Sequence, residues 1–436
     1  QSFINLNGKW NLEIKRKNSN VFKGEIIVPF PLESRLSGVD FKKQTNDIMV
    51  YTKTVTLSPS DKCFILNFGA VDQECNVYLN DNYIGENLGG YIPFSFDVTE
   101  FVKTSENTLR VEVIDTLDTE LAYGKQRRKR GGMWYTPVSG IWQTVWLESV
   151  PSDYISSLLI VPSIKNSSVY ITVISESDAD AVIEFNGKSF SATTNKVCEI
   201  PLGDFTAWTP ETPQLYEFSV KLGSDIVNSY FAMRSFSVEK DESGIMRLFL
   251  NGKPYFHNGL LDQGYFGDGL YTPESDEMMI SDIVRTKEMG FNMLRKHIKI
   301  EPMRWYYHCD RLGMLVWQDM PNTYDNSKTS WNYRGFDKVT EDAMTDADSD
   351  PNSLARVEAS IQASSQVTNL YAEENARLSA SIRSAASSDD IFFFIIFTRP
   401  SRNSGVSIGV EMLMAKPFTY ESVTFPRSIT FFTLKA

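Results

Sequence analysis

Short stretches in which apolar and polar residues alternate make up the first third of the chain, and they predict β-strands. Residues 63–68 alternate in this way, and residues 71–85 predict a β-hairpin whose turn is Asp81-Asn82. Aromatic and β-branched residues dominate these stretches. The pattern therefore predicts an N-terminal jelly-roll β-sandwich over residues 1–151.

Residues 152–238 carry a second set of short predicted strands, among them 169–174, 181–185 and 215–221. Their length and spacing favour a small immunoglobulin-like β-sandwich. No candidate chemistry stands out in this part of the chain, and we expect it to act as a spacer.

After Met246 the pattern changes to strands that alternate with helices. Ser275 is a good N-cap for a predicted helix, and Gly290 ends that helix in the C′ position. The apolar residues 291–294 then predict a short buried strand. The order of strands and helices predicts a (β/α)₈ TIM barrel over residues 239–436, of which the chain holds the N-terminal part only.

Polar side chains follow the predicted barrel strands, at the point where each strand ends. In a barrel of this kind the chemistry lies at the carboxyl ends of the strands. The residues that we expect there are Asp262, Gln263, Arg295, His297, Lys299 and Asp319.

Two of these side chains, and one nearby histidine, also have a structural interpretation. Arg295 could simply pair with Asp319 inside the barrel, and Lys299 could equally be a solvated surface charge. His308, on a predicted helix over residues 301–312, is expected to be structural.

Composition narrows the class of protein. With 436 residues the chain is long enough for two or three domains, and a formal charge of −12 argues against a nucleic-acid partner. The basic run from Lys125 to Arg130 is interpreted as a solvated loop. No run of about 18 apolar residues occurs, so we expect no membrane span. A periplasmic or secreted protein is favoured if a signal peptide was removed before Gln1.

Four cysteines, at positions 63, 75, 198 and 309, are too sparse for a disulfide framework. We expect buried thiols, and a bridge between Cys63 and Cys75 stays open. We expect no cofactor. The sequence leaves open whether a structural Mg or Ca ion is bound and whether the protein forms a homo-oligomer.

Residues 131–146 hold two adjacent glycines, three tryptophans and a tyrosine. One interpretation is a packed domain corner. The other is an aromatic ledge, with Trp134 as its candidate, because aromatic faces suit the apolar C–H faces of a sugar ring.

The order of these predicted domains and seven sequence segments resemble glycoside hydrolase family 2, the family of β-galactosidases, β-glucuronidases and β-mannosidases. The resemblance covers about residues 6–322. The segments are Leu6-Asn-Gly-Lys-Trp10, Asn76-Val-Tyr-Leu-Asn80 with Gly89-Gly-Tyr-Ile-Pro-Phe94, Ser139-Gly-Ile-Trp-Gln-Thr-Val-Trp146, Asn251-Gly-Lys-Pro254, Gly290-Phe-Asn-Met-Leu-Arg295 and Cys309-Asp-Arg-Leu-Gly-Met-Leu-Val-Trp317.

The resemblance implies a retaining hydrolase of terminal β-linked sugars such as β-galactosides, with two glutamates about 5 to 5.5 Å apart. It implies that Arg295 supports the nucleophile and that His297 contacts the substrate. Asp262, Gln263 and Asp319 would lie at the strand ends that face the sugar. Lys296 and Lys299 are too weak a basis for the cationic pocket of a glucuronidase.

After about residue 322 the sequence departs from the family pattern. Residues 376–383 and 390–397 match the helix and strand that should precede the acid/base glutamate, but Thr398-Arg399 stands where that glutamate is expected. An arginine cannot donate the proton. We therefore identify neither catalytic glutamate, and a non-catalytic carbohydrate-binding protein or an inactive fragment of such an enzyme is the alternative function.

Overall fold

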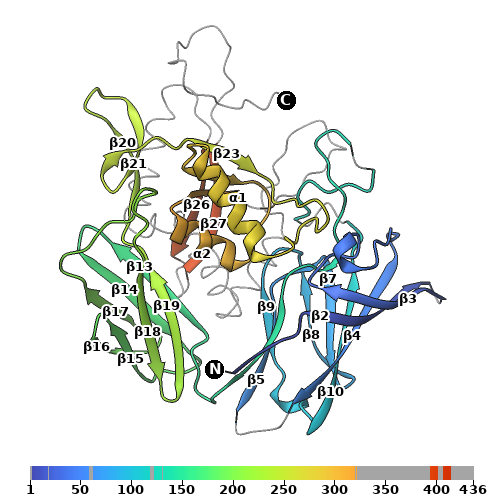
Figure 1. Cartoon of the computed structure of the whole chain (residues 1–436). Helices are drawn as coiled ribbons and strands as arrows, with labels where there is room; N and C mark the ends of the chain where they lie inside the picture. Colours follow the sequence, from blue (N-terminus) through green and yellow to red (C-terminus); the bar gives the residue numbers. More distant parts are fainter. Residues whose placement is uncertain are drawn as a thin grey trace. The chain divides into compact units, whose positions relative to one another are not determined.

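Two stacked sheets form the N-terminal part of the protein. The computed structural model describes residues 2–17, 19–57, 62–117, 122–129, 131–319 and 321, and the backbone of residues 393–400 and 406–413. One sheet has four strands in the order β1 (Ser2–Asn5), β12 (Val145–Val150), β5 (Cys63–Phe68) and β9 (Phe94–Asp97). The other has six, in the order β3 (Ser19–Val28), β2 (Gly8–Arg16), β4 (Asp47–Leu57), β10 (Ser105–Ile114), β7 (Glu74–Leu79) and β8 (Asn82–Leu88) (Figure 1).

The inward residues of both sheets form one apolar core, to which Trp10, Tyr51 and Phe68 contribute. Strands β6 (Val71–Asp72) and β11 (Gly140–Ile141) pair beside these sheets, and two short 3₁₀ helices, η1 (Arg35–Ser37) and η2 (Thr99–Phe101), lie in the connections. The predicted N-terminal β-sandwich is thus present, with its core on the predicted alternating positions.

The predicted hairpin over residues 71–85 forms between β7 and β8, but its turn lies one residue earlier than expected. Leu79 pairs with Asn82, so Asn80 and Asp81 are the two turn residues, and both have positive φ angles, 53° and 65°. A tight turn of this kind requires positive φ at both central residues, which Asn and Asp tolerate.

A second pair of sheets follows in residues 157–231. One sheet consists of β13 (Ser157–Ser163), β14 (Ser168–Ile174) and β17 (Val197–Pro201), and the other of β16 (Lys188–Thr193), β15 (Asp180–Phe185), β18 (Tyr216–Leu222) and β19 (Asp225–Phe231). Val169, Ile183 and Val220 are among the residues of a core shared by both sheets. The second predicted β-sandwich is therefore present.

A small antiparallel sheet leads to the part with helices. It contains β20 (Phe236–Lys240), β21 (Met246–Leu250) and β22 (Lys253–Pro254). Three parallel strands follow, β23 (Gly259–Asp262), β24 (Met293–Lys296) and β25 (Leu315–Gln318), with α1 (Asp276–Glu288) and α2 (Met303–Leu312) as their crossover connections.

Helix α1 begins after Ser275 as predicted, and Gly290 follows its last turn with a φ of 87°. Its buried residues Met279 and Ile283 are four positions apart, so they lie on one face and pack with α2 and the strands. Strand β24 begins two residues later than predicted, and Arg295 and Lys296 therefore belong to the strand itself.

Cys63, Cys75, Cys198 and Cys309 are all free thiols, so the thiols expected from the sequence are present and the Cys63–Cys75 bridge that was left open does not form. Cys75 and Cys309 are buried, whereas Cys63 and Cys198 are partly exposed. The predicted strand over residues 390–397 lies at β26 (Phe393–Pro400), which pairs in antiparallel fashion with β27 (Val406–Leu413).

The strands β26 and β27 belong to a separate compact unit, residues 371–436. Arg399 lies within β26, whereas the sequence placed it after the end of a strand. The predicted helix over residues 376–383 lies outside the described residues. In the described residues, no helix is long and apolar enough to cross a membrane.

Candidate functional site

The carboxyl ends of β23, β24 and β25 lie level with one another. Asp262 pairs with Lys296, which pairs with Gln318, in parallel register. The ladder continues past the strands, because the His297 N–H donates to the Asp262 carbonyl at 2.7 Å and the Asp319 N–H donates to the Lys296 carbonyl at 2.9 Å. The predicted strand-end residues Asp262, Arg295, His297 and Asp319 are therefore brought to one edge.

Arg295 and His297 share the carboxylate of Asp319. Arg295 donates from Nε to Oδ1 at 3.1 Å and lies 2.9 Å from Oδ2 through Nη2, and His297 Nδ1 is 2.5 Å from Oδ2. The structural pairing considered for Arg295 is thus present. It leaves 35% of the Arg295 side chain exposed, so the guanidinium can still contact a ligand.

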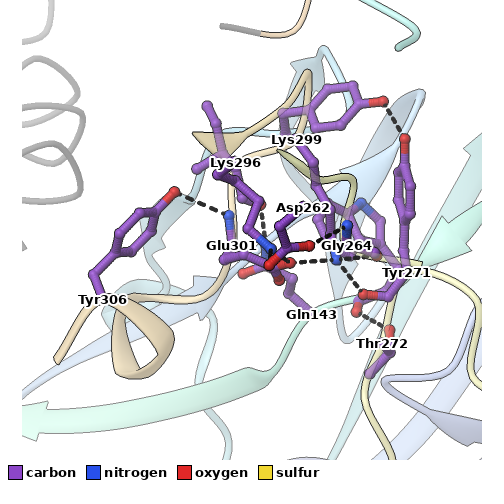
Figure 2. A network of polar contacts seen from close by, with 12 residues as sticks. Gln143, Asp262, Gly264, Tyr271, Thr272, Lys296, Lys299, Glu301 and Tyr306 are labelled. Carbon is purple, nitrogen blue, oxygen red and sulfur yellow. Dashed lines mark hydrogen bonds and ion pairs between the residues drawn. The ribbon is translucent and has the colours of Figure 1, made fainter. Parts of the chain in front are cut away.

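A buried ionic network lies directly behind this edge, and we name it the Glu301 network: Asp262, Lys296, Lys299 and Glu301. Figure 2 shows both lysines converging on Glu301, whose Oε1 accepts from Lys296 Nζ at 2.8 Å and from Lys299 Nζ at 2.9 Å. Lys296 Nζ also lies 2.7 Å from Asp262 Oδ2. Lys299 donates further to the carbonyls of Gly264 and Tyr271, each at 2.7 Å.

This arrangement corrects the surface-charge interpretation of Lys299. The side chain is fully buried, and its three donors are used by two carbonyls and one carboxylate. Lys299 therefore stabilises the network and has no donor left for a sugar. Sequence reasoning missed Glu301, although charged residues that alternate with Ile298 and Ile300 are a pattern that could have indicated it.

The pKa shifts in the network follow from burial and from the neighbouring charges. Burial lowers the pKa of Lys299 to about 8, with Lys296 acting in the same direction and Glu301 opposing it. For Lys296 burial acts downward, but Glu301 and Asp262 together raise its pKa. For Asp262 burial acts upward, but Lys296 lowers its pKa. Lys296 and Asp262 thus form an ion pair at neutral pH.

Hydrogen bonds beside the Glu301 network join this part of the chain to the N-terminal β-sandwich. Beside Tyr271, the Thr272 hydroxyl lies 2.6 Å from the Trp142 carbonyl and 2.9 Å from the Pro29 carbonyl. Gln143 donates to the Ile300 carbonyl at 3.4 Å. The site is therefore built by both parts of the chain.

The aromatic segment over residues 131–146 divides into packed and partly exposed residues. Trp142 is buried in a cluster with Tyr91 and Tyr271, as the packed-corner interpretation expects. Trp134 is half-buried, stacks on Tyr123 at 6.4 Å between ring centroids, and has the Arg127 guanidinium 3.8 Å above its ring. The role of Trp134 in sugar binding stays a prediction.

The other candidates are placed as follows. Gln263 follows β23, and its Oε1 is buried without a hydrogen-bond partner among the described residues. His308 accepts from Arg311 Nε at 3.0 Å, which agrees with the structural role expected for it. The described residues contain no group of three or more His, Cys, Asp or Glu side chains placed to hold a metal ion.

Comparison with known proteins points to one class. Residues 4–151 match the family model described as "Glycosyl hydrolases family 2, sugar binding domain". The predicted resemblance to glycoside hydrolase family 2 is therefore confirmed over this segment.

Individual relatives extend the match beyond that segment. A β-galactosidase of Thermoanaerobacter pseudethanolicus is 27% identical over 307 residues, which are 64% of this chain and 40% of the relative. A putative β-glucuronidase of Formosa agariphila is 26% identical over 294 residues, 62% of this chain and 34% of the relative. The match thus spans well under two thirds of these relatives.

A solved structure shows the same fold. The β-D-glucuronidase of Dictyoglomus thermophilum superimposes with a TM-score of 0.64 at 19% identity, over 79% of this chain and 63% of that one. At this identity the likeness concerns the fold alone.

Proposed function

We propose that the protein is a glycoside hydrolase that acts on terminal β-linked sugars, with β-galactosides as the first substrates to test. The observation that carries this proposal is the level edge at which Asp262, Arg295, His297 and Asp319 meet. The family match over residues 4–151 and the relatives named β-galactosidase and β-glucuronidase support it.

The comparison with glycoside hydrolase family 2 also supports a proposal for the fold of the parallel strands. The parallel strands β23, β24 and β25 with α1 and α2 would be the first part of a (β/α)₈ barrel, because their polar edge is where such barrels carry their chemistry. The second β-sandwich would be of immunoglobulin type.

The proposed mechanism is retaining, with one carboxylic acid that protonates the leaving oxygen and one carboxylate that attacks the anomeric carbon. Arg295 would hold the attacking carboxylate ionised, since a nearby guanidinium lowers the pKa of a carboxyl group. Asp319 orients both Arg295 and His297. With Nδ1–H donating to Asp319, His297 Nε2 would accept from a sugar hydroxyl. The two catalytic glutamates are not among the residues that we assign.

The test is turnover of chromogenic β-galactosides and β-glucuronides by the whole protein, beside a calorimetric titration with the free sugars. Arg295→Ala should lower turnover by about two to three orders of magnitude, the usual cost of removing one electrostatic contact at reacting groups. Arg304→Ala is the matched control, because Arg304 lies in an exposed pair with Asp276 on the helices and should leave turnover unchanged.

The outcomes separate the two candidate functions. Turnover that depends on Arg295 supports the hydrolase. Sugar binding without turnover of any β-glycoside supports the carbohydrate-binding alternative. Turnover at the wild-type rate in Arg295→Ala would remove the site assignment.

A further inference from the structure

An open groove lies between the second β-sandwich and helix α2, and we name it the Tyr307 groove. Its volume is about 820 Å³, within the range of roughly 300–1,000 Å³ that ligand pockets have. Its polar and aromatic side chains include Glu184, Glu217, Ser219, Asn228 and Tyr230 from the sheet and Tyr307 from α2. None of its lining residues belongs to the polar edge of the parallel strands or to the Glu301 network.

The pairing of β15, β18 and β19 places the polar side chains on one face of the sheet. Ser219 pairs with Glu184 on one side and with Asn228 on the other, so these three residues form a row across the strands. Glu217 pairs with Tyr230 in the next row. Paired side chains point to the same face, and successive side chains along a strand alternate between faces. The alternate positions fill the core of the sandwich, among them Ile183, Phe218 and Val220.

Two tyrosines give the groove an aromatic wall. The rings of Tyr230 and Tyr307 meet edge to face, with their centroids 5.2 Å apart. The Tyr230 hydroxyl donates to the Asp310 carboxylate at 3.0 Å, which fixes that ring in place. Tyr307 is 38% exposed, so part of its ring is open to a ligand. A ring that is already held loses little conformational entropy when a ligand packs on it.

These groups suit a ligand that is rich in hydroxyl groups. The carboxylates of Glu184 and Glu217 accept hydrogen bonds, whereas Ser219 and Asn228 both donate and accept. Neighbouring strands lie about 4.8 Å apart, so the row offers hydrogen-bonding groups at regular intervals. The tyrosine rings suit the apolar C–H faces of sugar rings. The sheet face and the helix together therefore match an oligosaccharide.

The charge of the groove selects among such ligands. Glu184 and Glu217 outnumber Lys188, which is the basic residue among the lining residues, so the net charge is negative and acidic sugars are disfavoured. A basic peptide would also suit this charge. Peptides, however, are commonly bound at a free sheet edge or in an apolar groove, and this groove is a polar sheet face.

We propose that the Tyr307 groove is a second carbohydrate site, which binds a chain of neutral sugars. The inference goes beyond the proposed hydrolysis, because the groove shares no residue with the edge at which Arg295 lies. A site of this kind would hold a long substrate or product on the protein independently of turnover.

The experiment is a calorimetric titration of the whole protein with two neutral tetrasaccharides, β-1,4-linked galactotetraose and β-1,4-linked glucotetraose. It is carried out in Arg295→Ala protein, so that a contribution of Arg295 is removed. We expect binding of at least one tetrasaccharide to remain in Arg295→Ala. Adding Tyr307→Ala or Glu217→Gln should weaken that binding about tenfold, the usual worth of one aromatic contact or one hydrogen bond to a charged group.

Both substitutions preserve the fold, because alanine favours a helix at the exposed Tyr307 position and glutamine keeps the shape of the exposed Glu217 side chain. Glu176→Gln is the matched control, since it removes the same charge from an exposed position of the same β-sandwich outside the groove, and it should leave the affinity unchanged.

Three results would overturn the inference. They are the absence of tetrasaccharide binding, binding that is unchanged in both groove variants, and binding of a hexalysine peptide that depends on Glu217 while neither tetrasaccharide binds. Each of them leaves the proposed hydrolase intact, because turnover of the small chromogenic glycosides is measured separately and depends on Arg295.

Discussion

His257 is a buried histidine whose tautomer is set by its neighbours. Trp317 Nε1–H donates to His257 Nδ1 at 2.8 Å, so Nδ1 must be unprotonated and the proton lies on Nε2. Nε2 is buried and has no hydrogen-bond partner among the described residues. Burial lowers the pKa of His257 from 6.5 to about 4, and the side chain is neutral in the folded protein at neutral pH.

This position predicts a loss of stability in mild acid. The unfolded chain takes up the proton near pH 6.5 and the folded protein only near pH 4, so stability is complete above pH 6.5 and falls as the pH drops to 4. At about 1.4 kcal/mol per pKa unit the loss is about 3 kcal/mol. Urea unfolding of the wild type between pH 8 and 4 measures it.

His257→Asn is the control for this pH effect. Its side-chain oxygen can still accept from Trp317 but does not titrate. The difference in unfolding free energy between the two proteins should shift by about 3 kcal/mol across this range. A parallel pH dependence in both proteins would show that His257 is not responsible.

At the scale of elements, Asp310 connects helix α2 to the second β-sandwich through an ion pair and hydrogen bonds. Its carboxylate accepts from Arg234 Nη2 at 2.8 Å and from the Tyr230 hydroxyl at 3.0 Å, and its carbonyl accepts from Trp208 Nε1 at 2.8 Å. Arg234 and Asp310 are both almost fully buried. The Arg234 guanidinium also lies 4.3 Å from the Trp208 ring centroid. The helix position therefore depends on a buried ion pair.

Asp310→Ala should lower the free energy of unfolding by about 3–5 kcal/mol, because it removes the carboxylate that pairs with the buried Arg234 guanidinium. Asp276→Ala is the matched control, since Asp276 is 44% exposed and pairs with the exposed Arg304. That control should cost at most about 1 kcal/mol. Chemical denaturation measures both, and an equal effect of the two substitutions would argue against a stabilising role of the buried pair.

The elements also show how far the sequence could predict the fold. Alternation identified β5 and the β7–β8 hairpin, because one face of each strand packs into the core of the sandwich. It ended the β24 strand too early, since Arg295 and Lys296 are polar. Arg295 pairs with Asp319 and Lys296 pairs with Glu301. A hydropathy pattern does not show which charged residues form such pairs.

At the scale of the whole molecule, the candidate site depends on contacts between parts that are far apart in the sequence. The ends of parallel strands necessarily meet, so the sequence could predict that Asp262, Arg295 and Asp319 lie together. It could not predict that Tyr135 stacks on Tyr265 or that Thr272 lies against Trp142, because these pairs are 130 residues apart.

The Glu301 network lies beside the contacts that join these distant parts, and Glu301→Gln tests its contribution to stability. The substitution leaves Lys296 and Lys299 buried with Asp262 as their remaining carboxylate in the network, and we expect a loss of about 3–5 kcal/mol in the free energy of unfolding at pH 7. Without Glu301 the pKa of Lys299 should fall below its value of about 8.

The lower pKa of Lys299 predicts how the loss in the free energy of unfolding of Glu301→Gln depends on pH. A lysine with a depressed folded pKa destabilises the protein while it is charged, and this cost disappears as the pH rises from the folded toward the unfolded pKa. The Glu301→Gln variant loses the Lys299 proton at a lower pH than the wild type does, so the difference in unfolding free energy between them should narrow as the pH approaches 8.

Glu25→Gln, which breaks an exposed pair with Lys9, is the matched control and should show neither effect. Unfolding titrations at pH 6, 7 and 8 measure both, and a Glu301→Gln protein within about 1 kcal/mol of the wild type at every pH would contradict a structural role for the network.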